Sequence, residues 1–132
     1  MVALFEMAIA TVAQTHHHIN VPYLLRADNI LVTLLVGFIE EVPFRGFLLQ
    51  KLQPLCGSWG AILLSGLLFA GIHLPLWLQY PPSIPLPLAF AGITFLGAIY
   101  GIVFRKTNTL WSVILIHSCY DLAVTLVTSA LR

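Results

Sequence analysis

Charged residues are scarce in this sequence. Only 8% of its 132 residues are charged and 59% are hydrophobic, whereas a soluble domain typically carries about 25% charged residues. The shortage excludes an ordinary soluble domain and predicts an integral, multi-pass membrane protein with the lipid bilayer as its partner. The net charge of +1 gives no basic surface for phosphates, so nucleic acid is excluded as a partner.

The sequence also has only two cysteines, and its first residues do not resemble a signal peptide. The two cysteines, Cys56 and Cys119, lie far apart without metal-type spacing, and we expect two apolar side chains rather than a disulfide. Residues 2–13 are apolar but lack a preceding basic region and contain Glu6, which does not fit a signal peptide.

Long apolar runs dominate the rest. They cover residues 30–52, 58–80, 86–104 and 109–131, and each is about 19 to 24 residues long, enough to cross a bilayer. Proline, glycine and a basic turn separate them. We predict an all-α fold, a polytopic transmembrane helical bundle with four core spanning helices over residues 30–132. Residues 1–29 are predicted to form a partial or interfacial N-terminal helix and a polar loop.

The basic residues predict an orientation. Alternating crossings place Lys51, Arg105 and Lys106 on one side and Arg26 and Arg132 on the other. The positive-inside rule then favours a cytoplasmic position for the first group.

Three of the four predicted helices carry ionisable residues in their interior. Such residues are costly in a membrane and are functional candidates by default. At about 1.5 Å per residue they lie at similar depths, roughly 10 to 20 Å from one side, which predicts one shared buried site. The residues are Glu40, Glu41 and Arg45 in the first run, His73 in the second, and His117 and Asp121 in the fourth. The third run has Gly92, Gly97 and Gly101 instead, which predicts close packing and a scaffolding role.

Spacing divides the charged residues by role. Glu41 and Arg45 are four residues apart and can pair on one helix face, and an arginine partner favours the ionised carboxylate and makes it a weak base. Glu40 has no such partner, so it takes a proton or pairs with another helix. His117 and Asp121 also share a face, as a structural pair or as part of a site.

Two further features bear on the site. Pro43 removes a backbone hydrogen bond beside the carboxylates and is expected to loosen the helix there. Consecutive side chains diverge, so the run of histidines at positions 16–18 indicates a solvated loop rather than a metal site.

Three motifs carry a family resemblance. The segment Glu-Glu-Val-Pro-Phe-Arg at 40–45 resembles the EExxxR motif of the CAAX-protease and bacteriocin-processing family of intramembrane endopeptidases (CPBP, also called Abi). Residues 69–73 resemble its FxxxH motif, and residues 117–121 its HxxxN motif with Asp in the last position. The likeness covers about residues 30–131. Members usually have additional spanning helices before this core, so we expect this chain to be short at its N-terminus.

The resemblance implies roles for these residues. Glu40 would activate the hydrolytic water with help from His73, and His117 and Asp121 would stabilise the oxyanion or orient the site. Supporting roles fall to Glu41, Arg45 and Phe69. The implied substrates are membrane-associated or prenylated (CAAX-type) proteins.

Asp121 departs from the family pattern, because prenyl-processing members typically have Asn there. An ionised Asp would repel an oxyanion, so it must be protonated, orient His117 or bind a metal. This favours a bacterial-type member in the plasma membrane.

The sequence leaves open whether the site binds a metal ion and whether the protein is an enzyme. Two histidines with carboxylates would suit Zn²⁺, held by Glu40, His73, His117 and Asp121, but the spacing is not that of an HExxH protease. We favour glutamate-type hydrolysis without a metal. The alternative is a non-hydrolytic membrane protein, either a proton or ion transporter or a bacteriocin-immunity or interaction scaffold.

Overall fold

The computed structural model describes residues 27–82 and 84–130, and every regular element in these ranges is a helix. The elements are α3 (Ala27–Glu41), the π-helix η1 (Val42–Leu48), α4 (Leu49–Gly71), α5 (Leu74–Gln79), α6 (Leu86–Thr107) and α7 (Leu110–Ala130). The predicted all-α class is confirmed. The predicted N-terminal helix, and the loop up to residue 26, lie outside the described residues.

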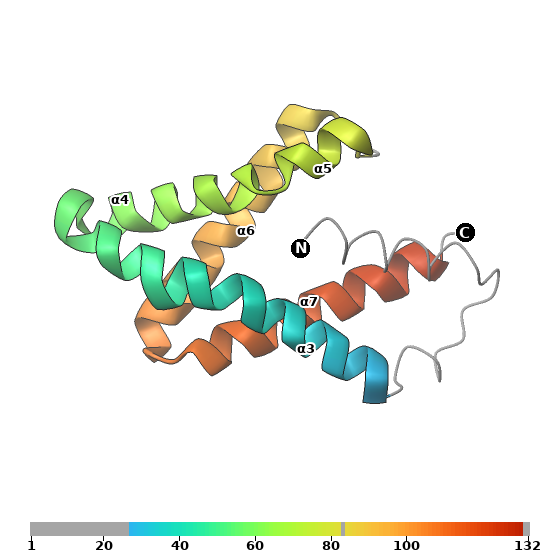
Figure 1. Cartoon of the computed structure of the whole chain (residues 1–132). Coiled ribbons are helices and arrows are strands. Elements are labelled where there is room, and N and C mark those ends of the chain that lie inside the picture. Colours follow the sequence, from blue (N-terminus) through green and yellow to red (C-terminus); the bar gives the residue numbers. More distant parts are fainter. Residues whose placement is uncertain (1–26, 83, 131–132) are drawn as a thin grey trace.

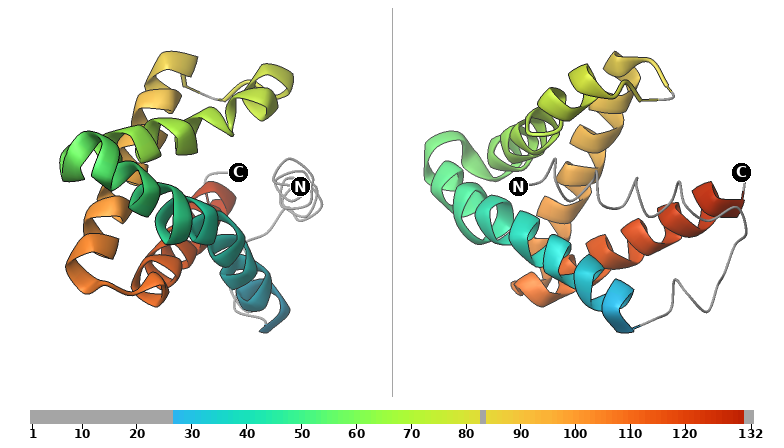
Figure 2. Two further views of the ribbon diagram at one scale, coloured as in Figure 1. Left: turned by 60° about the vertical axis from the view of Figure 1, so that its left-hand side comes forward. Right: turned by 45° about the vertical axis from the view of Figure 1, so that its right-hand side comes forward.

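The helices form two hairpins (Figures 1 and 2). In the first hairpin, α3, η1 and the start of α4 run as one rod. The backbone leaves the helical region at Cys56 and Gly57, and the rest of α4 runs back. Gly57 has φ +69°, a conformation that glycine adopts without steric cost. In the second hairpin, α6 and α7 are joined at Asn108, which is left-handed. The hairpins meet where α4 packs on α6 and α3 packs on α7.

One predicted run is interrupted. Residues 58–80 do not form a single helix, because α4 ends at Gly71 and α5 begins at Leu74. Pro75 explains the break, since it has no N–H to donate to the preceding turn and is tolerated only in the first turn of the new helix. The break places His73 in the turn between α4 and α5.

Several polar side chains are buried and many large apolar side chains are exposed, which is the reverse of the distribution in a soluble protein. Among the described residues, the buried polar side chains are Glu40, Glu41, Arg45, Ser65, His73, His117 and Ser118. Large apolar side chains such as Phe47, Leu55, Trp59, Leu78 and Phe95 are at least 62% exposed. An apolar exterior of this extent is stable in lipid and is a liability in water.

Two described stretches are long and apolar enough to cross a membrane by length and composition. They are Asn29–Gln79, which contains both arms of the first hairpin, and Leu86–Thr107. A shorter apolar helix covers Leu110–Thr125.

Glycine allows α4 and α6 to approach closely. A Cβ atom at Gly66 would lie 2.7 Å from the Thr94 carbonyl oxygen, and one at Gly97 would lie 3.0 Å from the Gly66 Cα atom. Small residues at such crossings let helix backbones come together in membranes. The predicted packing role is therefore confirmed for Gly97, but it is wrong for Gly92, which has open space around it.

This crossing predicts opposite effects for two glycine-to-alanine changes. We expect Gly66→Ala to lower the free energy of unfolding by about 1 to 3 kcal/mol, because the new methyl group meets backbone atoms that cannot move independently. Gly92→Ala is the matched control, and there alanine should stabilise the helix by up to about 1 kcal/mol. Unfolding in detergent measures both. A Gly66→Ala variant as stable as the wild type would contradict the close crossing.

Candidate active site

A buried ion pair lies at the centre of the bundle. Arg45 Nη1 lies 2.9 Å from one carboxylate oxygen of Glu41 and 3.0 Å from the other, and both side chains are fully buried. Arg45 Nη2 donates to the Gly97 carbonyl oxygen on α6 at 2.8 Å. The guanidinium also lies over the Phe69 ring, 4.6 Å from its centroid. The predicted pair is confirmed, and it ties the first hairpin to α6.

His117 on α7 joins this pair from the second hairpin. Its Nδ1 lies 2.7 Å from Glu41 Oε1, a hydrogen bond between groups 76 residues apart in sequence. A carboxylate at this distance fixes which ring nitrogen faces it and so directs the other one. Glu41 therefore both neutralises Arg45 and orients His117.

The second imidazole nitrogen faces the two remaining carboxylates. His117 Nε2 lies 3.7 Å from Glu40 Oε2 and 3.5 Å from Asp121 Oδ2. The Glu40 side chain is 8% exposed, whereas that of Asp121 is 30% exposed. Glu40 thus finds its neighbour on another helix, one of the two alternatives left open by the sequence. The shared depth predicted for Glu40, His117 and Asp121 is confirmed.

An irregular backbone carries the carboxylates to this position. The helix changes from α to π at Val42, directly after Glu41, and Pro43 stands at the start of the π-helix. The Leu49 N–H bonds to the Phe44 carbonyl, five residues back, as a π-helix requires. Such insertions are rare and often occur at functional sites. The expected loosening of the helix beside the carboxylates is confirmed.

His73 lies next to this cluster, with the Phe69 ring in contact with both imidazoles. Phe69 is 5.3 Å from His73 and 5.9 Å from His117 between ring centroids, edge-on to each. His73 Nδ1 donates to the Phe69 carbonyl oxygen at 2.9 Å. Because a carbonyl oxygen only accepts, Nδ1 carries the hydrogen, and Nε2 is the nitrogen that can accept a proton.

The sequence did not indicate the role of α6, which it assigned to scaffolding. Tyr100 on α6 is 1% exposed and stacks on His117, with centroids 5.1 Å apart and an angle of 27°. The Gly97 carbonyl on the same helix accepts from Arg45. The only indication in the sequence was that Tyr100 follows Gly97 by one helical turn. An aromatic residue in an apolar helix is ordinarily part of the hydrophobic core, so this indication was not specific.

The donor arrangement gives no support for a metal ion. Among the described residues, no group of three or more His, Cys, Asp or Glu side chains is placed to hold one. Glu41, Asp121 and Glu40 instead lie around His117 at hydrogen-bond and ion-pair distances. The preference for metal-free hydrolysis stays a prediction.

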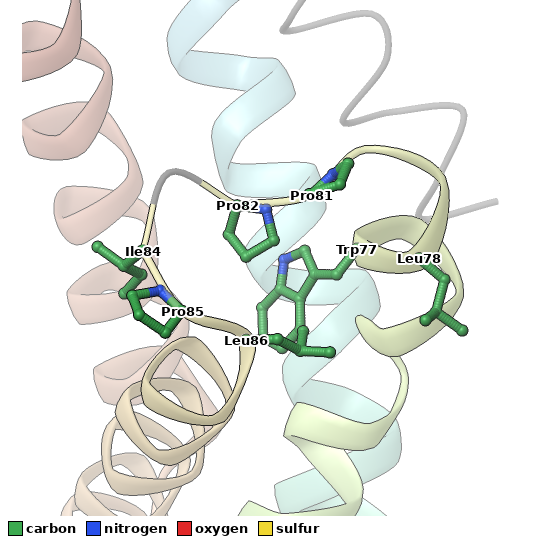
Figure 3. Close-up of a pocket in the computed structure, with 7 residues that line it drawn as sticks. All are labelled: Trp77, Leu78, Pro81, Pro82, Ile84, Pro85 and Leu86. Carbon is green, nitrogen blue, oxygen red and sulfur yellow. The ribbon is translucent and has the colours of Figure 1, made fainter.

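An apolar pocket lies between the end of α5 and the start of α6 (Figure 3). It has a volume of about 580 Å³ and is lined by Trp77, Leu78, Pro81, Pro82, Ile84, Pro85 and Leu86. The Trp77 ring also contacts His73, with centroids 5.5 Å apart. The pocket therefore adjoins the His73 side of the site and does not contain the carboxylates.

The comparison with known families decides the identity of the chain. A sequence model of the Rce1-like type II CAAX prenyl endopeptidases matches residues 22–123. The chain belongs to this family. The match includes all of the ionisable residues from Glu40 to Asp121. No curated protein and no solved structure matched the chain.

Membership of the Rce1-like family agrees with the apolar exterior described above. Rce1-like proteins are membrane peptidases that act on membrane-associated protein substrates. The family match therefore favours a peptidase over the transporter and the immunity scaffold that the sequence left as alternatives.

Proposed function

We propose that this protein is an intramembrane endopeptidase that hydrolyses peptide bonds of membrane-associated or prenylated proteins. The observation that carries the proposal is the surroundings of His117, which has Glu41 at 2.7 Å, Asp121 at 3.5 Å and Glu40 at 3.7 Å. Placing so many acid and base groups inside an apolar bundle costs folding free energy, and such groups ordinarily mark a functional site. Hydrolysis uses all of them.

Glu40 acts as the general base. It takes a proton from a water molecule, and the oxygen of that water bonds to the carbonyl carbon of the peptide. Glu41 does not suit this role, because Arg45 and His117 already occupy its carboxylate. His73, which contacts the same Phe69 ring as His117, is assigned to assist in moving the proton.

His117 stabilises the oxyanion formed in this step. His117 donates its Nδ1–H to Glu41, and in the imidazolium form, which the surrounding carboxylates stabilise, a second N–H at Nε2 points to the side of the ring where Glu40 and Asp121 lie. A prepositioned donor of this kind is typically the largest single source of rate enhancement in acyl transfer. Collapse of the intermediate breaks the C–N bond, and the proton taken from water passes to the leaving amine.

Asp121 orients the site rather than contacting the oxyanion. Its carboxylate lies 3.5 Å from His117 Nε2 and is the most exposed of the three. Of the alternatives raised by the sequence, this assignment needs neither a metal nor a fixed proton on Asp121.

The two hairpins support our proposal for the membrane arrangement. We assign four spanning segments, namely the two arms on either side of Cys56 and Gly57, then α6 and α7. These segments are apolar, and exposed side chains such as Leu35, Leu63 and Phe95 lie on the first three. The charged cluster then lies inside the bilayer, where an anchored substrate can reach it.

Reconstitution in liposomes tests this function. The purified protein is mixed with a peptide anchored through a prenylated cysteine, with an unprenylated transmembrane peptide, and with a pH-sensitive dye inside the vesicles. We expect cleavage of at least one peptide at a defined bond, identified by mass spectrometry, and no proton flux above that of empty liposomes. Proton flux without cleavage by the folded protein would contradict the proposal and support the transporter.

A further inference from the structure

Tyr100 has a place in the site that its sequence context does not suggest. It lies on α6, the helix without catalytic groups, yet its side chain is 1% exposed and faces the centre of the bundle. Its ring stacks on His117 at 5.1 Å and lies 5.3 Å from the Arg45 guanidinium carbon. It therefore contacts both residues that bond to the Glu41 carboxylate.

The hydrogen bond to Glu41 leaves one motion of His117 unrestrained. A single bond at Nδ1 does not fix the plane of the imidazole, because coupled rotation about χ1 and χ2 can still tilt the ring while Nδ1 stays near the carboxylate oxygen. That rotation would swing Nε2 away from Glu40 and Asp121. A ring stacked on one imidazole face blocks it, and the edge of Phe69 limits it further.

We infer that Tyr100 is a positioning residue, whose ring holds the plane of the His117 imidazole so that Nε2 stays directed at the reacting atoms. This inference rests on the proposed function. The ring carries the effect, because the Tyr100 hydroxyl has no hydrogen-bond partner among the described residues. Phenylalanine should therefore replace tyrosine, and an aliphatic side chain should not.

Three variants test the inference. We expect Tyr100→Leu to lower kcat by about ten- to a hundredfold with little change in KM, the size of effect that small misplacements of catalytic groups produce. Tyr100→Phe should keep a kcat near that of the wild type. The matched control is Phe104→Leu, one turn along the same buried face of α6, which should lose thermal stability but keep kcat.

The outcomes separate positioning from packing. A Tyr100→Leu variant with wild-type kcat would overturn the inference. Equal losses of kcat in Tyr100→Leu and Phe104→Leu would overturn it too, because general loosening would then explain both. Equal losses in Tyr100→Leu and Tyr100→Phe would assign the effect to the hydroxyl and also overturn it.

A second measurement does not depend on activity. With ¹⁵N-labelled histidine, and the signal assigned by its absence in His117→Asn, the wild type and Tyr100→Phe should show one ordered His117 imidazole. Tyr100→Leu should show a broadened signal from several orientations. If the wild type failed to cleave any substrate, the proposed function would fail while this spectrum still decided the role of Tyr100. An unchanged spectrum in Tyr100→Leu would overturn that role.

Discussion

Glu40→Gln should reduce kcat by about a hundred- to ten-thousandfold, the range ascribed to a positioned general base. The amide has almost the same shape as the carboxylate but cannot take a proton from water. Because the change removes a charge without creating a cavity, we expect the protein to stay inserted and folded. Cleavage of an anchored peptide gives kcat, and thermal unfolding in detergent gives stability.

The adjacent carboxylate is the matched comparison. Glu41→Gln makes the same chemical change one residue along the chain, but it leaves the buried Arg45 without its partner and His117 without its anchor. We expect this variant to lose both stability and cleavage. If Glu40→Gln retained full cleavage, Glu40 would not be the base. If it unfolded to the same extent as Glu41→Gln, the assignment of separate roles to the two residues would fail.

Arg45→Met should lower the free energy of unfolding by about 3 to 5 kcal/mol, the usual cost of leaving one member of a buried ion pair alone. Methionine fills most of the arginine volume, so little of the loss comes from a cavity. The double variant Glu41→Gln/Arg45→Met removes both charges and should recover a large part of this loss. Unfolding in mixed detergent micelles measures the free energy of unfolding of the wild type, Arg45→Met and the double variant.

An exposed arginine on α6 provides the control. Arg105→Met is the same substitution at a residue in the last turn of α6 that is open to solvent. It should change the free energy of unfolding by no more than about 0.5 kcal/mol, as surface substitutions generally do. Similar losses in Arg45→Met and Arg105→Met would contradict the claim that the Arg45 pair holds the bundle together.

Residues that carry charge into an apolar run are the most informative part of the sequence. Glu40, His117 and Asp121 could be grouped by depth alone, because helix rise is constant and a polar group in lipid needs a partner. Helix spacing likewise predicted the Glu41–Arg45 pair, and Pro43 predicted the disturbed helix next to it. These inferences depend only on local geometry and on the cost of burying charge.

Contacts between helices could not be predicted in the same way. The Glu41 carboxylate lies closer to His117 than the Asp121 carboxylate does. This order depends on how α3 and α7 are rotated about their axes, which the sequence does not reveal. Tyr100 was missed because a stacked aromatic ring is indistinguishable in sequence from a core residue. The turn that holds His73 was missed because Pro75 lies inside an apolar run long enough to span a bilayer, although proline is tolerated in spanning helices only when neighbours satisfy the backbone.

The central claim is that the side chains of this buried cluster hydrolyse a peptide bond by themselves. The most direct measurement is the rate at which purified protein in liposomes cleaves an anchored peptide before and after treatment with a zinc chelator, alongside analysis of bound metal. We expect the rate to change by less than about twofold and bound zinc to be substoichiometric, since a zinc enzyme loses its nucleophilic water with its metal. Loss of cleavage on chelation, restored by adding Zn²⁺, would contradict the claim.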